Sequence, residues 1–129
     1  MRVIMFKPQF TPKIISGDKT STIRPKARCK PGDILSLRKW SDKPYRSKHK
    51  IIMETTCKSL HPVRVSDIGI TIGRLCILWQ MTQAGTIAKM EGFDTPGDMR
   101  EFFQKTHNLP FEGALIYWGD NPLDLEELS

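Results

Sequence analysis

A glycine turn opens directly into a short strand in the segment Gly17-Asp18-Lys19-Thr20-Ser21-Thr22-Ile23-Arg24. In such a strand, alternate side chains face opposite sides of the sheet, so Thr20, Thr22 and Arg24 share one face and Ser21 lies on the other. Lys19 stands where the backbone leaves the turn, and its long side chain can reach the first of these faces. The segment therefore predicts an amine, a hydroxyl and a guanidinium within one pocket. An ordinary edge strand with solvated side chains fits the pattern equally well.

The length and composition indicate one domain. We expect it to cover residues 1–121, followed by an acidic tail over residues 122–129. A domain of this size buries roughly two thirds of the surface that its unfolded chain exposes, so it needs no disulfide framework. The three cysteines and three histidines have no metal-site spacing, which indicates reduced thiols in a cytoplasmic protein. The sequence has no apolar run of membrane-spanning length and its start is too short for a signal peptide. We expect no membrane, metal or cofactor.

Positive charge is concentrated in the first half of the chain. Residues 1–60 contain fifteen Lys or Arg against four Asp or Glu, a net charge of +11, and residues 61–129 contain five against ten, a net charge of −5. A predicted basic hairpin mixes aromatic side chains with cations, and its candidate nucleic-acid contacts are Arg38, Lys39, Trp40, Tyr45, Arg46 and Lys48. This composition suits phosphate neutralisation and stacking on an unpaired base. An equally open interpretation is a solvated hairpin whose charges keep an exposed edge from pairing with other chains.

In the first half, periodicity and turn residues predict a strand at residues 3–6 and then a helix of about two turns. Thr11 is its expected N-cap, Phe10 is expected to pack on Ile15, and Gly17 is its expected left-handed end. A turn at residues 31–33 leads into a strand at residues 34–40, and residues 50–57 are expected to return beside it.

In the second half, we predict strands at residues 63–65, 69–72, 75–79 and 114–118. A helix that begins near residue 81, or at Thr86 as an alternative N-cap, ends at Gly92. A second helix is capped by Thr95, and its buried stripe, which we assign to the core, comprises Met99, Phe102 and Phe103. Short strands with two or three helices and little βαβ alternation indicate an α+β domain built on a small, mixed, barrel-like sheet.

Glu91 lies at the predicted C-terminal end of a helix, directly before Gly92. The partial negative charge of a helix end disfavours a carboxylate there. A carboxyl group in this place tends to keep its proton, as a proton donor working near neutral pH must. On the sequence alone, the simpler interpretation is a solvated Glu91 whose placement costs roughly a few tenths of a kcal/mol.

The order of motifs resembles the ASCH domain, a relative of the PUA fold. The pattern F-x-P-x-I-x-x-G-x-K-T-x-T-I-R occupies residues 10–24, and a P-G-D turn at residues 31–33 follows. Then come an M-E-G-F segment at residues 90–93, a Thr-capped helix and an F-x-G-x-x-x-x-W strand. The resemblance implies a PUA-like small mixed β-barrel with two to three flanking helices and a basic cleft fitted to RNA or a nucleoside.

Within that family the chain resembles the small bacterial amidohydrolases that remove the acetyl group from N(4)-acetylcytidine, although it is longer and its basic hairpin is elaborated. The resemblance implies Lys19 as proton acceptor, Thr22 as nucleophile and Glu91 as proton donor. A threonine hydroxyl needs a base to take its proton, and a lysine can do so only if burial or nearby positive charge lowers its pKa. Arg24 supplies such a charge. The candidate substrate-binding residues are Thr20, Ser21 and Arg24.

Three functions follow as hypotheses. An amidohydrolase acting on N(4)-acetylcytidine or a similar N-acylated nucleoside predicts a closed pocket of nucleoside size. A non-catalytic RNA-binding module predicts an open basic groove continuous with the hairpin. A ribonuclease is the weaker third hypothesis because the sequence has no convincing histidine pair, and it would use Lys19 and Glu91 as base and acid.

Overall fold

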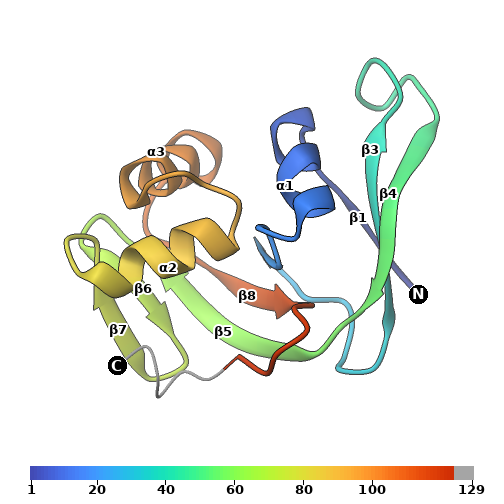
Figure 1. The fold of residues 1–129 in the computed structure, drawn as a ribbon. Coiled ribbons are helices and arrows are strands. Elements are labelled where there is room, and N and C mark those ends of the chain that lie inside the picture. Colours follow the sequence, from blue (N-terminus) through green and yellow to red (C-terminus); the bar gives the residue numbers. More distant parts are fainter. Residues whose placement is uncertain (124–129) are drawn as a thin grey trace.

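In a computed structural model the chain has the α+β fold that the sequence predicts (Figure 1). The structure describes residues 1–123, so most of the predicted acidic tail lies outside the described residues. Within them the elements are β1 (Arg2–Met5), the 3₁₀ turn η1 (Pro8–Phe10), α1 (Thr11–Ser16), β2 (Ser21–Arg24), β3 (Ile34–Trp40), β4 (His49–Thr56), β5 (Ser59–Val65), β6 (Gly69–Ile72), β7 (Leu75–Leu78), α2 (Thr82–Met90), α3 (Pro96–His107) and β8 (Phe111–Tyr117). No helix in this part of the chain is long and apolar enough to cross a membrane.

The N-terminal half builds a three-stranded sheet in the order β1, β3, β4. β1 runs parallel to β3, and β3 and β4 form an antiparallel hairpin that pairs Ile34 with Thr56 and Trp40 with His49. A register shift at Leu37 interrupts the ladder, and such irregularities increase the local twist of a strand pair. The far end of this hairpin carries the basic segment and projects at the top of Figure 1.

The second sheet is antiparallel and has the order β2, β8, β5, β6, β7. β8 lies between β2 and β5, so Ile116 pairs with Thr22 on one side and with Leu60 on the other. β4 leads into β5 through residues 57 and 58, and β5 passes beneath the helices and so connects the two sheets (Figure 1). The predicted barrel-like β-structure is therefore built from two hydrogen-bonded sheets.

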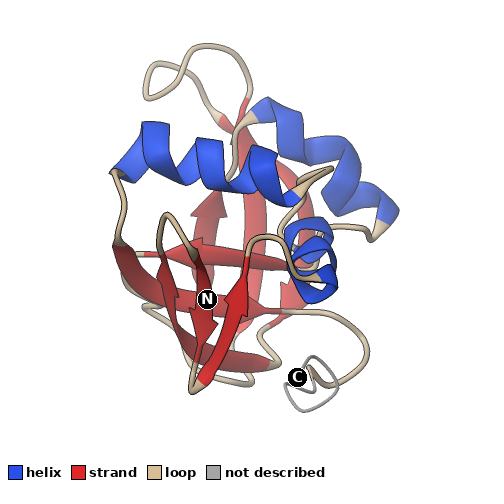
Figure 2. Cartoon of the chain, turned by 90° about the vertical axis from the view of Figure 1, so that its left-hand side faces the viewer, coloured by secondary structure: helices blue, strands red, loops and turns tan. Residues whose placement is uncertain are grey.

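Aliphatic side chains from both sheets form the core. The helices lie against one side of the strands, which curve below and behind them (Figure 2). Leu35 and Leu37 of β3, and Ile70 and Ile72 of β6, are fully buried because residues two apart in a strand face the same side. Burial of each such side chain stabilises the fold by roughly 1.5–3 kcal/mol.

The first helix begins differently from the prediction. η1 runs straight into α1, so Thr11 already has helical dihedral angles (φ −57°, ψ −49°) and is not the N-cap. Its buried hydroxyl has no hydrogen-bond partner among the described residues. The predicted anchor at Ile15 is also wrong, because Ile15 is 68% exposed and Ile14 enters the core instead. Gly17 ends the helix with φ +86°, as predicted for a left-handed C-cap.

The two later helices confirm one predicted cap and correct another. α2 follows Met81, which is extended, so Thr86 lies inside the helix and is not its N-cap. α3 begins as predicted, and the Thr95 hydroxyl accepts a hydrogen bond from the backbone N–H of Asp98 at 3.1 Å. These two helices, joined by residues 91–95, bring the M-E-G-F segment beside β2.

Candidate active site

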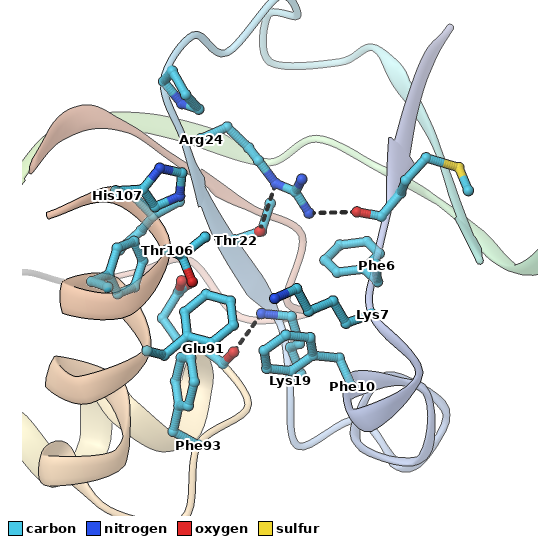
Figure 3. A pocket seen from close by; sticks show the side chains of 15 residues that line it. Phe6, Lys7, Phe10, Lys19, Thr22, Arg24, Glu91, Phe93, Thr106 and His107 are labelled. Carbon is cyan, nitrogen blue, oxygen red and sulfur yellow. Dashed lines mark hydrogen bonds between the residues drawn. The ribbon is translucent and has the colours of Figure 1, made fainter. Parts of the chain in front are cut away.

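A cavity of about 210 Å³ lies between the residues after β1, the strand β2, the C-terminal end of α2, and α3 (Figure 3). Lys19, Thr22 and Glu91 all line it, although Glu91 lies 72 residues after Lys19 in the chain. Arg24 lies on the same wall. The structure therefore brings together the three side chains to which the family resemblance assigns catalytic roles. The aromatic part of the lining consists of Phe6, Phe10, Phe93, Phe102, Phe103 and His107.

The Lys19 side chain is buried, and the residue is only 3% exposed. Its Nζ atom donates hydrogen bonds to the main-chain oxygen of Ser21 at 2.7 Å and to the main-chain oxygen of Glu91. The ring centres of Phe6 and Phe10 lie 5.5 and 4.8 Å from Nζ, within the range of cation–π attraction. An amine in this place keeps one further position free for a ligand or a reacting hydroxyl.

The surroundings of Lys19 make its proton easier to release. Burial lowers the pKa of Lys19 from 10.5 to about 8. The negative charge of Glu91 opposes this shift, and the positive charge of Arg24 adds to it. Lys19 is therefore much closer to releasing its proton at neutral pH than an exposed lysine is. This is the condition under which a lysine can serve as a general base.

Glu91 is buried directly after the last residue of α2, and the interpretation of a solvated side chain is wrong. The residue is 2% exposed, and its carboxylate accepts a hydrogen bond from the Ser21 hydroxyl. A buried carboxylate at the negative end of a helix is unfavourable unless donors or cations compensate for it. The Ser21 hydroxyl provides a donor, and the nearby charges of Lys19 and Arg24 provide the cations.

Arg24 connects β2 to β1 and orients Thr22. Its Nη2 atom donates to the main-chain oxygen of Met5 at 2.8 Å, and its Nε atom donates to Thr22 Oγ1 at 3.1 Å. The guanidinium carbon lies 4.9 Å from the ring centre of Phe6. Burial lowers the pKa of Arg24 to about 10, which leaves it cationic at neutral pH. Because Thr22 Oγ1 accepts from Arg24, its own hydrogen can be donated to a base or to a ligand.

Thr20 and Ser21, two of the predicted substrate-binding residues, occupy supporting positions. The backbone N–H of Thr20 donates to the carbonyl of Met90 at 2.9 Å, and its carbonyl accepts from the N–H of Trp118 at 2.9 Å. Ser21 holds the Glu91 carboxylate, as described above. Of the three predicted substrate-binding residues, all of them within the described part of the chain, Arg24 is the one that lines the cavity.

Gly92 allows the end of α2 to approach Lys19. Its φ of +94° lies in the left-handed region that favours glycine. A Cβ atom at this position would stand 2.8 Å from Lys19 Cδ and 3.0 Å from Phe10 Cδ1. The glycine after Glu91 therefore serves both the backbone turn and the close packing of the buried lysine.

The predicted nucleic-acid contacts lie on the β3–β4 hairpin, separate from the cavity lining. The Trp40 ring packs against those of Tyr45 and His49, with 5.2 and 4.6 Å between ring centres. Tyr45 is 89% exposed, and exposed cations follow it at Arg46 and Lys48. The remaining predicted residues, Arg38 and Lys39, are half-buried. The Nε atom of Arg38 donates a hydrogen bond to Ser36 Oγ at 2.8 Å.

The position of Phe102 shows that the apolar stripe of α3 does not lie entirely in the core, contrary to the prediction. Its ring is half-buried and lines the cavity, packed against Phe10 and Phe93 with 5.6 and 5.2 Å between ring centres. Phe103 is nearly fully buried and also borders the cavity, whereas Met99 lies in the core as predicted. Helical periodicity identifies an apolar face, but a face that borders a ligand cavity and one that borders the core give the same pattern.

Sequence reasoning missed three polar residues of the lining. Lys7 enters from the turn before η1, and Thr106 and His107 enter from the last turn of α3. The His107 ring stacks on Phe111 with 4.3 Å between ring centres and 31° between planes. Burial lowers the pKa of His107, and the positive charges of Arg24 and Lys7 lower it further. An isolated histidine and a single lysine carry no spacing signal by which they could have been found.

The cavity supplies acid–base and nucleophilic groups. Within residues 1–123, no three His, Cys, Asp or Glu side chains group closely enough to hold a metal ion. The polar groups that meet in the cavity are an amine of lowered pKa, a hydroxyl, a carboxyl group and a guanidinium. Together they can deprotonate a nucleophile, protonate a leaving group and stabilise an oxyanion.

Comparisons with known proteins return one family name. No family model matches this chain, and no curated protein matches it. Among solved structures, the chain is similar to a protein described as ASCH from Zymomonas mobilis, with 18% sequence identity and a TM-score of 0.49. The match covers 97% of this chain and 73% of that protein. Its name is that of the family that the sequence resembles, the ASCH domain.

Proposed function

We propose that this protein is an amidohydrolase that removes an acyl group from the exocyclic nitrogen of a nucleobase, with N(4)-acetylcytidine as the leading candidate substrate. One observation carries the proposal: a buried lysine whose pKa is lowered to about 8 shares a cavity with a threonine hydroxyl and a buried carboxyl group. The resemblance of residues 10–24 and 90–93 to the N(4)-acetylcytidine amidohydrolases supports the choice of substrate.

The size and lining of the cavity suit an acylated base. Ligand pockets for drug-sized molecules usually measure about 300–1,000 Å³, and this cavity of about 210 Å³ is smaller. It therefore fits a base and its acyl group, while the attached ribose extends into the opening. Phe6, Phe10 and Phe102 offer aromatic surfaces on which a base can stack.

The acylation step uses the three grouped side chains. With Lys19 neutral and Glu91 as a carboxylate, Thr22 Oγ1 attacks the amide carbon and gives its proton to Lys19. The negative charge that develops on the amide oxygen is stabilised by the ammonium group that Lys19 has become. Glu91 then takes this proton from Lys19 and donates it to the exocyclic nitrogen, and the bond between the carbonyl carbon and that nitrogen breaks. Cytidine leaves with a free amino group, and the acetyl group remains as an ester on Thr22.

A water molecule completes the cycle. Its oxygen attacks the ester carbon while one of its protons passes to Lys19, which is neutral again after the first step. The bond between the ester carbon and Thr22 Oγ1 breaks, and the threonine oxygen recovers a proton from Lys19. Acetic acid is released with every group back in its starting state. Lys19 thus accepts and gives up one proton in each of the two steps, Glu91 passes on one proton in the first, and the substrate amide and one water are consumed.

A hydrolysis assay tests this function. Purified protein is incubated with N(4)-acetylcytidine, and cytidine and acetate are quantified over time. We expect equal molar release of both products, and a loss of activity of about 10²-fold or more in each of Thr22→Ala, Lys19→Met and Glu91→Gln. Thr71→Ala, a half-buried threonine of β6 outside the cavity lining, is the matched control and should retain activity. Absence of hydrolysis, or hydrolysis that persists in Thr22→Ala, would contradict the proposal.

A non-catalytic RNA-binding role is the second candidate, and the exposed Tyr45 ring beside Trp40 is the observation that favours it. Aromatic rings next to cations provide stacking and phosphate neutralisation for unpaired RNA. We expect Tyr45→Ala, and Arg46→Ala combined with Lys48→Ala, to weaken binding of a labelled single-stranded RNA, and binding to fall steeply with salt. Thr22→Ala should bind that RNA normally. Cleavage of the RNA in the same assay would support the ribonuclease hypothesis instead.

A further inference from the structure

Three cationic or hydrogen-donating side chains line the cavity in addition to Lys19. Figure 3 shows Lys7 arriving from the turn before η1, Arg24 from β2 and His107 from the end of α3. Lys7 and His107 are exposed, whereas Lys19 and Glu91 on the same cavity are almost completely buried. The cavity therefore has buried polar groups inside the protein and exposed ones, Lys7 and His107, at its mouth, and Arg24 contacts Thr22.

The mouth lacks carboxylates to balance these groups. Within residues 1–123 the ion pairs closer than 4.0 Å involve Lys13, Arg64 and Lys105, and none includes Lys7, Arg24 or His107. Glu91 acts on Arg24 from inside the cavity. The positive charges at the mouth repel one another, and they disfavour protonation of the imidazole. A cleft lined by charges of one sign attracts ions of the opposite sign, so this arrangement suits an anion.

The groups at the mouth are also held in place before any ligand arrives. The Lys7 ammonium lies 5.1 Å from the ring centre of Phe102. The His107 ring is stacked on Phe111, as described above. Arg24 is fixed by hydrogen bonds through Nε and Nη2, and its Nη1 atom makes no side-chain hydrogen bond within residues 1–123. Donors that are positioned in advance lose little freedom when they bind an anion.

We propose that Lys7, Arg24 and His107 form a phosphate subsite, so that the enzyme acts on a nucleotide unit rather than on a free nucleoside. This inference rests on the proposed function, because it requires the acylated base to occupy the cavity. A base that fills about 210 Å³ leaves its ribose at the mouth, and a phosphate on that ribose then meets the three side chains. Lys7 and Arg24 offer charge-assisted hydrogen bonds to it, and the neutral His107 ring donates one N–H.

The experiment compares substrates that differ only in the phosphate. The kcat/KM is measured for N(4)-acetylcytidine, for its 5′-monophosphate and 3′-monophosphate, and for a trinucleotide that contains the same base. We expect at least one phosphorylated form to exceed the nucleoside by roughly five- to tenfold, which is the effect of about one partly exposed charge-assisted contact. The trinucleotide distinguishes a phosphate within an RNA strand from that of a mononucleotide.

Substitutions then locate the subsite. Lys7→Gln and His107→Asn should each reduce the ratio of kcat/KM for the phosphorylated substrate to that for the nucleoside, and together they should bring this ratio to about one. Lys58→Gln is the matched control, since it removes a surface lysine outside the cavity lining and should preserve the preference. Equal kcat/KM for all substrates, or a preference that survives the double substitution, overturns the proposal.

Binding of the products separates this inference from the proposed reaction. The affinities of cytidine and of its 5′- and 3′-monophosphates are measured by calorimetry on the same proteins. Hydrolysis of the nucleoside without any phosphate preference overturns the subsite alone. Phosphate-dependent binding that requires Lys7, in a protein with no hydrolytic activity, supports the subsite and contradicts the reaction. Absence of both binding and hydrolysis overturns both.

Discussion

The ammonium of Lys19 donates a hydrogen bond to the main-chain oxygen of Glu91, 72 residues later in the chain. This bond links the start of β2 to the end of α2. The acceptor is the main-chain oxygen, and among the ion pairs within residues 1–123 none joins the two side chains. The Glu91 carboxylate instead accepts a hydrogen bond from the Ser21 hydroxyl. The amine and the carboxyl group therefore influence each other through charge, and each keeps the capacity to exchange a proton with a substrate.

The pH dependence of activity should report the protonation state of Lys19. A general base works only when it has lost its proton, and the pKa of Lys19 is lowered to about 8. We expect kcat/KM for N(4)-acetylcytidine to rise about tenfold per pH unit below this value and to level off above it. The positive charge of Arg24 contributes to the lowered pKa, so Arg24→Gln should move the midpoint to higher pH. A profile that is flat between pH 6 and pH 8 would contradict the assignment of Lys19 as the base.

The same lowered pKa predicts a change of stability with pH. Below about pH 8, Lys19 is protonated in both states and the folded protein buries the charge. Between about 8 and 10.5, the folded state releases this proton while the unfolded chain still binds it, so the contribution of Lys19 to stability rises with pH. Lys19→Met lacks this group. The free energy of unfolding of the natural protein relative to Lys19→Met should therefore increase from pH 7 to pH 9.5, by about 2 kcal/mol.

Urea denaturation of both proteins across this pH range provides the measurement. Other titrating groups are common to the two chains, and their effects largely cancel in the difference. A difference that stays constant with pH, or that shrinks as the pH rises, would show that Lys19 keeps an ordinary pKa. The two pH experiments are independent, because the second requires no substrate.

Local sequence patterns predicted the turns, helix ends and strand faces around the site. Gly17, the turn at residues 31–33 and the Thr95 cap act through their own backbone conformations, so the sequence is sufficient to locate them. Strand alternation also predicted that Thr22 and Arg24 share a face, and the structure joins these two side chains by a hydrogen bond. Their meeting with Glu91 depends on packing between distant segments, and a family resemblance was needed to anticipate it.

Other features lie beyond what local patterns can tell. Ile14 and Ile15 are adjacent residues with the same side chain. Only the way α1 packs on the sheets determines that Ile14 is buried and Ile15 is exposed. Phe102 lies on the same helical face as Met99. Phe102 nevertheless borders the cavity, because α3 packs beside Phe10 without filling the space between them. Lys7 lines the cavity from the residue directly before η1. Each outcome depends on tertiary packing rather than on neighbouring residues in the chain.

Ser21→Ala should affect both stability and activity. The substitution leaves the buried Glu91 carboxylate without the hydroxyl that donates to it, which costs about 1–3 kcal/mol. A less constrained carboxyl group should also lower kcat several-fold while KM changes less, because Ser21 positions the proton donor. Ser36→Ala is the matched control: Ser36 is equally buried, in the other sheet, and accepts a hydrogen bond from Arg38. It should lose stability and retain kcat per folded molecule. Equal loss of kcat in both variants would contradict this role for Ser21.

Gly92→Ala separates backbone strain from disturbance of the site. Gly92 and Gly17 both have left-handed dihedral angles, with φ of +94° and +86°, so an alanine costs about 1–2 kcal/mol of backbone strain at either position. At Gly17 the new methyl group meets no atom within 4 Å, whereas at Gly92 it would stand 2.8 Å from Lys19 Cδ. We therefore expect Gly17→Ala to lower the melting temperature and to retain full kcat/KM at a temperature where it is folded. Gly92→Ala should lose more stability and should also lose activity by about tenfold or more, because displacement of a catalytic group by about 1 Å can cost 10²-fold. Thermal denaturation and hydrolysis assays on the two variants make the comparison. If Gly92→Ala is as active as Gly17→Ala, the position of Lys19 does not govern the reaction.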